Sequence, residues 1–248
     1  DEWVPLPAEI TAVLARALDV ARLSHGAFDP TVGALVDAWG FGAARGAPDA
    51  AAIRAATQAM HRPAYQNLEL ELEPANGRAR KHAPLQVDLC GIAKGYAVDR
   101  MIDVLKQHGV AHALAALDGE LRALGGQADG QPWAVALESP TPGQRSAHGV
   151  LELQDLAVAT SGDYRHFVQV GAERLAHTMD ARRATPVRND VASVTVLAPE
   201  GMSADAWATA LLVAGGDHGL ALAQRLGLEV LFLVRRAGRL VGLGLGRY

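Results

Sequence analysis

The chain has 248 residues and a formal net charge of −4, and half of its residues are hydrophobic. This composition is typical of a globular protein, long enough for one large domain or two closely packed lobes. The scattered basic residues and an aromatic content of 5% argue against a nucleic-acid-binding protein. The single cysteine, Cys90, excludes an intrachain disulfide and any site built from several cysteines. No apolar run reaches the roughly 18 residues needed to span a bilayer.

Helices and strands are predicted to interleave irregularly along the sequence. In chain order we expect helices at 7–23, 34–39 and 48–59, strands at 66–73, 78–82 and 85–89, a helix at 95–108, strands at 113–124, 133–138, 149–153, 157–160, 168–170 and 192–197, helices at 203–214 and 218–226, and a closing hairpin of 229–235 and 239–245. Within the strand at 113–124, Gly119 is interpreted as a bulge or a point of close approach. Because the pattern lacks repeated βαβ units, it favours an α+β fold over a doubly wound parallel sheet.

The segment VDLCGIAKGYAVD, residues 87–99, predicts a strand that ends in a glycine-rich turn and then opens a long helix. Gly91 and Gly95 allow a tight turn and the close approach of a ligand. Lys94 lies between them near the helix start, where it could meet an anion. Glycines are also common in such turns for steric reasons only, so a ligand site and a plain turn are both open at this point.

A second candidate site lies on the predicted helix at 203–214. Asp205 and Thr209 are four residues apart and therefore share one face of this helix, which we expect Ser203 to cap. Carboxylate and hydroxyl oxygens are hard ligands that suit Mg²⁺. The alternative is an acidic residue favoured in a first helical turn, together with a threonine that bonds to its own backbone.

Five segments resemble the ApbE family, the FAD:protein FMN transferases, in their order and approximate spacing. These are GAFDPTVGALVDAWGFG (26–42), DLCGIAKGYAVD (88–99), ATSGDYRHF (159–167), AHTMDARRATPV (176–187) and MSADAWATALLVAG (202–215). The resemblance runs from about Ala17 to Gly215. It implies an ApbE-like α+β fold with mixed and antiparallel sheets flanked by helices, and two closely packed lobes with a flavin cleft between them. Residues 1–248 are interpreted as a single domain of this kind.

The resemblance also implies a metal site and a flavin site. The matching metal ligands for Mg²⁺ are Asp205, Thr209 and the backbone carbonyl of Gly91. The residues expected to contact FAD are Ala27, Phe28, Asp29, Asp88, Lys94, Ser161 and Asp163. Structural interpretations stay open beside these: Phe28 as a core aromatic, Asp29 as the cap of a turn with Pro30, and residues 161–163 as a tight polar turn.

The expected catalytic residues are His177 and Asp180. The resemblance places His177 near the reacting phosphate, either taking the proton of the acceptor hydroxyl or positioning the substrate. Asp180 then either orients the histidine or accepts the proton itself. A structural role for this histidine is the alternative.

The implied activity is the Mg²⁺-dependent transfer of the FMN half of FAD to a threonine or serine hydroxyl of a partner protein, with release of AMP. Two alternatives need nearly the same residues: hydrolysis of FAD to FMN and AMP, and non-catalytic FAD binding. The implied partners are flavoproteins of respiratory electron transport, with no nucleic acid. The resemblance also implies a periplasmic or other extracytoplasmic location, with lipid anchoring to the inner membrane as in many relatives.

The sequence departs from the family pattern in three places. The usual DPRTGYPV reads DARRATPV at 180–187, so the turn loses a proline and a glycine. The usual GGE signature reads Asp118-Gly119-Glu120, where Asp118 would add either repulsion or a second metal ligand. Family members also carry several tens of residues ahead of the first helix. Either that segment is trimmed from this chain, or its flavin site is incomplete.

Overall fold

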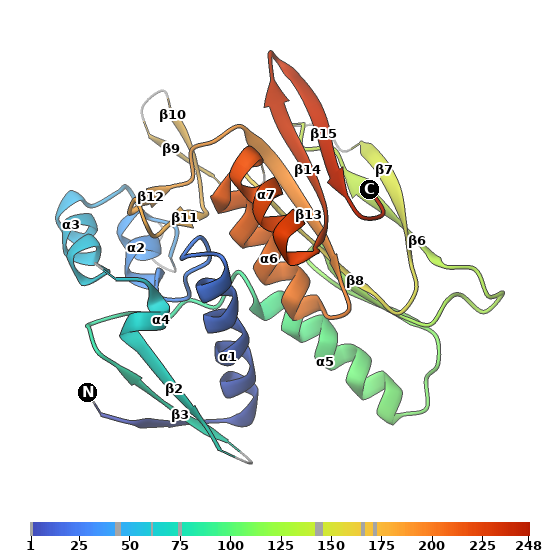
Figure 1. Ribbon diagram of the computed structural model, residues 1–248, viewed down its shortest axis with the longest axis horizontal. Helices are drawn as coiled ribbons and strands as arrows, with labels where there is room; N and C mark the ends of the chain where they lie inside the picture. The colour runs from blue at the N-terminus through green and yellow to red at the C-terminus, as the bar shows by residue number, and fades with distance from the viewer. Residues whose placement is uncertain are drawn as a thin grey trace. The chain divides into compact units, whose positions relative to one another are not determined.

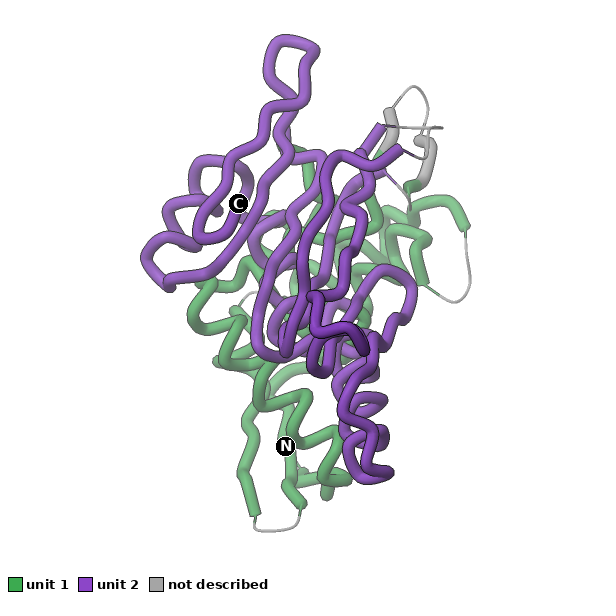
Figure 2. Tube along the Cα trace, turned by 90° about the vertical axis from the view of Figure 1, so that its right-hand side faces the viewer, with its two compact units in different colours: residues 1–90, 166–189 green, residues 91–165, 190–248 purple. Residues whose placement is uncertain are grey.

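The protein divides into two compact units whose segments alternate along the chain (Figure 2). The computed structural model describes residues 2–42, 46–60, 62–73, 76–141, 146–164, 167–170 and 173–248. Unit 1 comprises residues 1–90 and 166–189, and unit 2 comprises residues 91–165 and 190–248. The metal ligands expected from the sequence all belong to unit 2, whereas the expected catalytic pair belongs to unit 1.

Unit 1 combines helices with short antiparallel sheets (Figure 1). Its helices are α1 (Ala8–Leu23), α2 (Gly33–Ala38), α3 (Ala50–Ala59) and α4 (Ala64–Asn67). Its strands are β1 (Val4–Leu6), β2 (Leu68–Leu72), β3 (Gly77–Lys81), β9 (Phe167–Val170), β10 (Glu173–Ala176), β11 (Met179–Asp180) and β12 (Thr185–Pro186). The described strands form a sheet in the order β1-β3-β2 and the pairs β9-β10 and β11-β12, all antiparallel.

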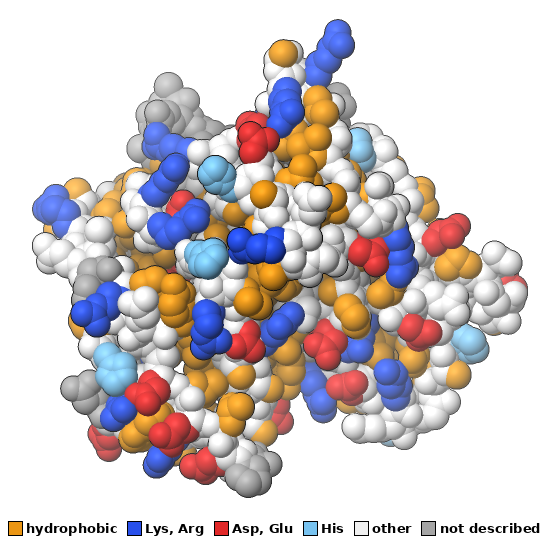
Figure 3. Space-filling view, viewed as in Figure 1, with side chains coloured by type: hydrophobic (Ala, Val, Ile, Leu, Met, Phe, Trp, Pro, Cys, Tyr) orange, Lys and Arg blue, Asp and Glu red, His pale blue; other side chains and the backbone are white. Residues whose placement is uncertain are grey.

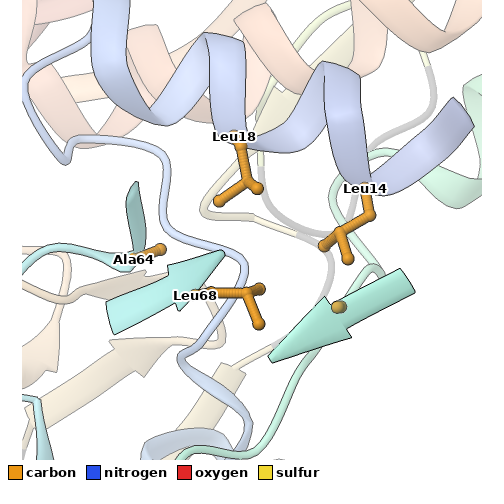
Figure 4. Packing of buried hydrophobic residues seen from close by; sticks show 5 residues of the cluster. Leu14, Leu18, Ala64 and Leu68 are labelled. Carbon is orange, nitrogen blue, oxygen red and sulfur yellow. The ribbon is translucent and has the colours of Figure 1, made fainter. Parts of the chain in front are cut away.

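The amphipathic first helix forms as its sequence predicts, and its apolar face makes a core of unit 1. Leu14 and Leu18 of α1 pack with Leu68 of β2 and Ala79 of β3, and Ala64 of α4 completes the cluster (Figure 4). Each of these side chains is almost fully removed from water. Burial of a leucine side chain contributes roughly 1.5–3 kcal/mol. This cluster therefore fixes α1 on the β1-β3-β2 sheet, just before the turn at residues 24–31.

Unit 2 is built on an antiparallel sheet with the described strand order β15-β14-β13-β8-β5-β4. Its strands are β4 (Ala113–Leu117), β5 (Glu120–Leu124), β6 (Trp133–Glu138), β7 (Ala147–Leu153), β8 (Ala157–Gly162), β13 (Val191–Ala198), β14 (Glu229–Arg236) and β15 (Arg239–Leu245), of which β6 and β7 pair with each other. Its helices are α5 (Ala93–Gln107), α6 (Gly201–Ala214) and α7 (Gly216–Leu226). These antiparallel sheets with helices confirm the predicted α+β class.

Helix α6 is the central helix of unit 2. It packs against β8 and β13 of the sheet and against α5. Its sequence is apolar nearly all round, which is typical of a helix that is enclosed by the protein. Asp205 is the charged residue of this helix, and it is buried with it. The core packing that holds α6 therefore also fixes the position of this carboxylate.

The first turns of α5 and α6 approach each other at two glycines. A Cβ atom at Gly95 would lie 2.1 Å from the carbonyl oxygen of Gly201, and a Cβ at Gly201 would lie 2.6 Å from that of Gly95. The carboxylate of Asp99 on α5 accepts hydrogen bonds from Gly201 N at 2.7 Å and from Met202 N at 2.9 Å. Arg122 of β5 also donates to Asp99, at 2.7 Å. Asp99 therefore caps α6 from a different helix.

Three sequence-based expectations about local structure are wrong. The strand expected at 113–124 is the hairpin β4–β5, whose turn residues Asp118 and Gly119 have φ angles of 49° and 110°. An Asp-Gly pair with positive φ at both positions is a strong hairpin signal. The strand expected at 85–89 does not form, apart from one parallel bridge between Val32 and Gln86. Ser203 does not cap α6, because the helix begins at Gly201 under the Asp99 carboxylate.

The surface shows no block of a single charge sign on the face that Figure 3 presents, where acidic and basic side chains are interspersed with apolar ones. The net charge of −4 likewise gives no overall electrostatic attraction for a polyanion. No helix in the described part of the chain is long and apolar enough to cross a membrane.

We predict that Gly95→Ala destabilises the protein by about 1–3 kcal/mol, because overpacking a close backbone contact displaces both helices. The free energy of unfolding in urea measures this effect. Gly149→Ala is the matched control, because a Cβ at Gly149 meets no atom within 4 Å, and it should change stability by less than about 0.5 kcal/mol. Equal stability of the two variants would contradict the proposed close approach.

Candidate functional site

The expected metal ligands lie where α5, α6 and β8 meet in unit 2. Asp205, in the second turn of α6, accepts a hydrogen bond through Oδ2 from Gly95 N at 2.9 Å. Thr209 lies one helical turn further on, with its Oγ1 3.0 Å from Oγ of Ser161 on β8. Gly91 lies in the turn that leads into α5. The fold thus brings Asp205 of α6 to Gly95, in the first turn of α5.

Asp205 is a buried carboxylate whose charge is poorly compensated by the protein. Its residue is only 3% exposed. Burial is the largest cause and the nearby charge of Glu120 the second, and they raise the pKa of Asp205 from the ordinary 3.8 to about 7 although the Gly95 N–H and Lys94 act to lower it. A divalent cation would supply the missing positive charge. The oxygen donors of Asp205, Thr209 and a backbone carbonyl are the type that Mg²⁺ prefers, so these residues fit that ion.

This donor set contains a single carboxylate. Consistently, the described residues hold no cluster of three or more His, Cys, Asp or Glu side chains arranged as a metal site. Mg²⁺ commonly binds proteins through one or two carboxylates and completes its shell with water and substrate phosphates.

Lys94 lies beside this carboxylate, in an ion pair that sequence reasoning missed. Its Nζ is 2.9 Å from Oε1 of Glu120, the first residue of β5. Burial lowers the pKa of Lys94, but the hydrogen bond and charge of Glu120, together with the charges of Asp205 and Asp118, raise the pKa overall. Lys94 therefore stays protonated at neutral pH. If the Asp118-Gly119 turn had been recognised in the sequence, Glu120 would have been placed at the start of a strand. That position was the available signal for Glu120 as a candidate site residue.

The segment 161–163 has structural partners within unit 2. Ser161 contacts Thr209, as described, which places it next to the metal ligands. Both carboxylate oxygens of Asp163 accept hydrogen bonds from Arg235 of β14, at 2.7 and 2.8 Å. The expected FAD contact by Asp163 stays a prediction, and the structure adds a bidentate ion pair that the sequence did not indicate.

The turn at 27–29 in unit 1 is internally bonded. Ala27, Phe28 and Asp29 are each buried. Asp29 Oδ1 accepts from the N–H and the hydroxyl of Thr31, at 2.8 and 2.6 Å, and its Oδ2 accepts from Ala64 N at 3.0 Å. Asp29 thus shapes its own turn and joins it to α4. Its expected contact with FAD stays a prediction.

Asp88 closes a local turn just ahead of the glycine-rich segment. Its Oδ1 accepts from Cys90 N at 2.7 Å, and its own N–H donates to the carbonyl of Pro30 at 2.8 Å. Asp88 is half-buried and joins the segment at residues 88–90 to the turn at residues 27–31. The structure therefore brings two of the segments expected to contact FAD together.

The expected catalytic residues lie on the β10–β11 connection and on β11. His177 is exposed, and Asp180 is buried. Asp180 Oδ1 accepts from the Nε of Arg182 at 3.0 Å, and Oδ2 accepts from its NH2 at 3.1 Å. The carboxylate is thus held by an arginine that the sequence did not indicate as its partner. Proton transfer through His177 and Asp180 stays a prediction.

The turn that departs from the family pattern keeps a backbone conformation suited to glycine. Ala184, which stands where the pattern has glycine, has a φ of 54°. This left-handed conformation is unfavourable for alanine by roughly 1–2 kcal/mol. Ala184 is buried, and its carbonyl accepts a hydrogen bond from Trp39 Nε1 at 3.2 Å. Packing and this bond hold the turn in shape despite the lost glycine.

Unit 1 also carries an open groove of about 880 Å³ with a largely apolar lining. Its walls come from β1, α1, β2, β3 and the segment 81–89, and they include the exposed side chains of Val4, Ile10 and Val87. None of the site residues expected from the sequence lines it, although Asp88 lies between two that do.

Comparisons with known proteins agree with the segments quoted from the sequence. A family model described as "ApbE family" matches residues 1–232. The FAD:protein FMN transferase of Haemophilus influenzae is 34% identical over 239 residues, which is 94% of this chain and 68% of that protein. The transferase of the same name from Vibrio cholerae is 38% identical over 223 residues, 90% of this chain and 66% of the relative. The chain therefore spans about two thirds of the length of these relatives.

Solved structures show the same fold. The apo form of the flavinyl transferase ApbE from Pseudomonas stutzeri superposes with a TM-score of 0.84 at 36% identity, covering 98% of this chain and 74% of that one. The flavin transferase ApbE from Vibrio cholerae gives a TM-score of 0.83 at 34% identity, covering 97% and 76%. The α+β architecture expected from the sequence is confirmed.

We predict that the metal-free protein loses stability as the pH rises from about 4 to 7. In this window the native Asp205 carboxyl, with a pKa of about 7, still holds a proton that the unfolded chain, with a pKa near 3.8, has released. Stability falls with pH wherever the native state binds more protons than the unfolded state. The loss amounts to a few kcal/mol at most, since one pKa unit corresponds to about 1.4 kcal/mol.

Urea unfolding at pH 5 and pH 8 after chelation measures this effect. Asp205→Asn should remove this component of the pH dependence, and Mg²⁺ should restore stability to the unsubstituted protein at pH 8. An identical pH dependence in both proteins would show that Asp205 titrates normally.

Proposed function

Because this chain belongs to the ApbE family, we propose that it catalyses the Mg²⁺-dependent transfer of FMN from FAD to a threonine or serine hydroxyl of a partner protein. The curated relatives are transferases of this name, which supports an enzyme over a passive flavin-binding protein. The observation that carries the proposal is the buried carboxylate of Asp205, which faces the start of α5 with Lys94 and Thr209 nearby. An uncompensated buried negative charge among oxygen donors is suited to a cation.

In this reaction the acceptor hydroxyl oxygen attacks the phosphorus on the FMN side of the FAD pyrophosphate. The bond from that phosphorus to the bridging oxygen breaks, and AMP leaves with the bridging oxygen. Mg²⁺, when bound, would supply positive charge that offsets the charge of the phosphates. Asp205, Thr209 and the Gly91 carbonyl would hold the ion, and Lys94 would add a positive charge for the phosphates.

His177 takes the proton of the attacking hydroxyl in this proposal. A base within hydrogen-bond reach of the acceptor is needed, because an unactivated hydroxyl is a weak nucleophile. His177 is an exposed residue. Asp180 is tied to Arg182, an arrangement that favours a positioning role for this carboxylate over proton uptake.

The acceptor class and the location are parts of the same proposal. A protein acceptor follows from the activity named for the relatives, and respiratory flavoproteins are the class that the sequence resemblance implies. An extracytoplasmic location rests on that resemblance alone, and fractionation of cells that express the chain tests it.

We predict that the protein releases AMP from FAD when Mg²⁺ and an acceptor protein are present, and that Asp205→Ala abolishes the release. The expected loss is at least 100-fold, because the ion that offsets phosphate charge no longer binds. AMP is measured by chromatography, and the acceptor is examined by mass spectrometry for added FMN. Asp217→Ala removes an exposed carboxylate of the same unit and should have no effect.

Each outcome of this assay separates the candidate functions. AMP release with FMN on the acceptor supports transfer, whereas release without acceptor modification supports FAD hydrolysis. FAD binding with no AMP release in any condition would contradict an enzymatic role.

We predict that His177→Asn lowers the transfer rate by about 10²–10⁴-fold while Mg²⁺ and FAD still bind, because general base catalysis contributes in this range. Single-turnover transfer, together with flavin fluorescence for binding, measures the two effects separately. His218→Asn, an exposed histidine on α7, is the control. A His177 variant with an unchanged transfer rate would assign the proton to another group.

A further inference from the structure

Two buried carboxylates and a single ammonium group come together in unit 2. Glu120 and Asp205 are 2% and 3% exposed. Lys94 lies near both, bonded to Glu120 at 2.9 Å and electrostatically coupled to Asp205. With both carboxylates ionised, the cluster carries one more negative than positive charge. Buried charges that are left unbalanced are costly unless a ligand or ion completes them.

Glu120 has an oxygen that the protein leaves without a partner. Its Oε1 accepts from Lys94, while its Oε2 is fully buried and has no hydrogen-bond partner. Buried polar atoms in native proteins nearly always have partners, so an exception of this kind indicates a missing ion, water or ligand. This observation is independent of the identity of Asp205 as a metal ligand.

The Lys94–Glu120 pair is not needed to join α5 to β5. Arg122 of β5 already bonds to Asp99 of α5 at 2.7 Å, with both side chains largely buried. A purely structural role for Glu120 would also be served by an apolar residue, because replacing a buried ion pair with packed hydrophobic groups is often neutral for stability. A role in ligand binding better explains a buried glutamate that has one oxygen without a hydrogen bond.

We propose that Glu120 is a positioning residue of the Mg²⁺–FAD site, which holds Lys94 toward the phosphates and adds a second negative charge that draws the cation to Asp205. Its Oε2 is buried and has no hydrogen-bond partner, so the negative charge of Glu120 is left for a cation at Asp205 to offset electrostatically. The inference rests on the proposed function, because it assigns Glu120 to the same site. Outer residues of this kind typically change metal affinity by 10–100-fold when they are substituted.

The test is a calorimetric titration of Mg²⁺ into chelator-treated protein without FAD, followed by FAD binding with Mg²⁺ present. Glu120→Gln keeps the shape but removes the charge, and we expect a 10–100-fold weaker Mg²⁺ affinity. Glu229→Gln is the control, because Glu229 of β14 is a glutamate of the same unit that is paired with Arg247 at 3.0 Å and lies outside the Lys94–Asp205 cluster, and the Mg²⁺ affinity of this variant should equal that of the unsubstituted protein. Thermal melting shows that each variant is folded.

A second variant gives an effect of opposite sign. Lys94→Gln leaves both carboxylates without their ammonium group, so Mg²⁺ alone should bind more tightly than to the unsubstituted protein, whereas FAD should bind more weakly. If the Lys94–Glu120 ion pair had only a structural role, Lys94→Gln and Glu120→Gln would weaken Mg²⁺ binding alike. This variant also keeps the inference testable if Glu120→Gln fails to fold.

The outcomes separate this inference from the proposed function. If the unsubstituted protein binds Mg²⁺ through Asp205 but Glu120→Gln binds it equally well, only the role of Glu120 is overturned. If Lys94→Gln and Glu120→Gln weaken Mg²⁺ binding alike, the charge argument is overturned. If the unsubstituted protein does not bind Mg²⁺ at all, the proposed function and this inference fail together.

Discussion

The close contact between the first turns of α5 and α6 is the constraint on which unit 2 depends. It requires glycine on both sides, because a Cβ at Gly95 or Gly201 would overlap a backbone carbonyl of the other helix. The Asp99 carboxylate locks the contact by accepting from two N–H groups of α6 and from Arg122. An acidic group at a helix N-terminus is favourable both as a hydrogen-bond acceptor and against the helix dipole.

The same contact places the candidate metal ligands. Because the two helices meet at Gly95, the N–H of this residue can donate directly to Asp205, one turn into α6. With a larger residue at either position the helices would separate, and Asp205 would lose both this bond and its proximity to Lys94. One packing requirement therefore explains the glycine of the AKG segment and the geometry of the acidic site.

Periodicity predicted the elements that local sequence determines. The amphipathic pattern of residues 7–23 gives α1 to within one residue, since its core-facing leucines recur at helical spacing. One error arose where a contact between residues far apart in the sequence determines the local structure. Ser203 was expected to cap α6 by a local rule, but the cap comes from Asp99, about a hundred residues earlier in the chain. The β4–β5 hairpin was missed although Asp118-Gly119 is a local turn signal.

In the candidate site, too, some residues could be predicted from the sequence and others only from the fold. Residue types and family segments pointed to Asp205, Thr209 and Gly91, and the fold places Asp205 and Thr209 on one helix face near the start of α5. Sequence reasoning did not find the partners Glu120, Arg182 and Arg235, because each ion pair joins residues whose proximity depends on the turn or sheet that carries them. Such pairs can be identified only once the three-dimensional fold is known.

The burial of Asp205 is best understood as preorganisation. A carboxylate on a surface helix would cost little to ionise, but its side chain would have to be ordered when the ion and substrate arrive. On α6, core packing and the Asp99 cap fix the side chain in advance, at the expense of a pKa raised to about 7 in the absence of a cation. Groups that are already oriented require little reorganisation during reaction, which is the main source of electrostatic stabilisation in enzyme sites. The destabilised carboxylate and the rigid helix are therefore two consequences of one arrangement. Under the proposed function, stability of the metal-free protein is given up so that a cation can bind beside the phosphates.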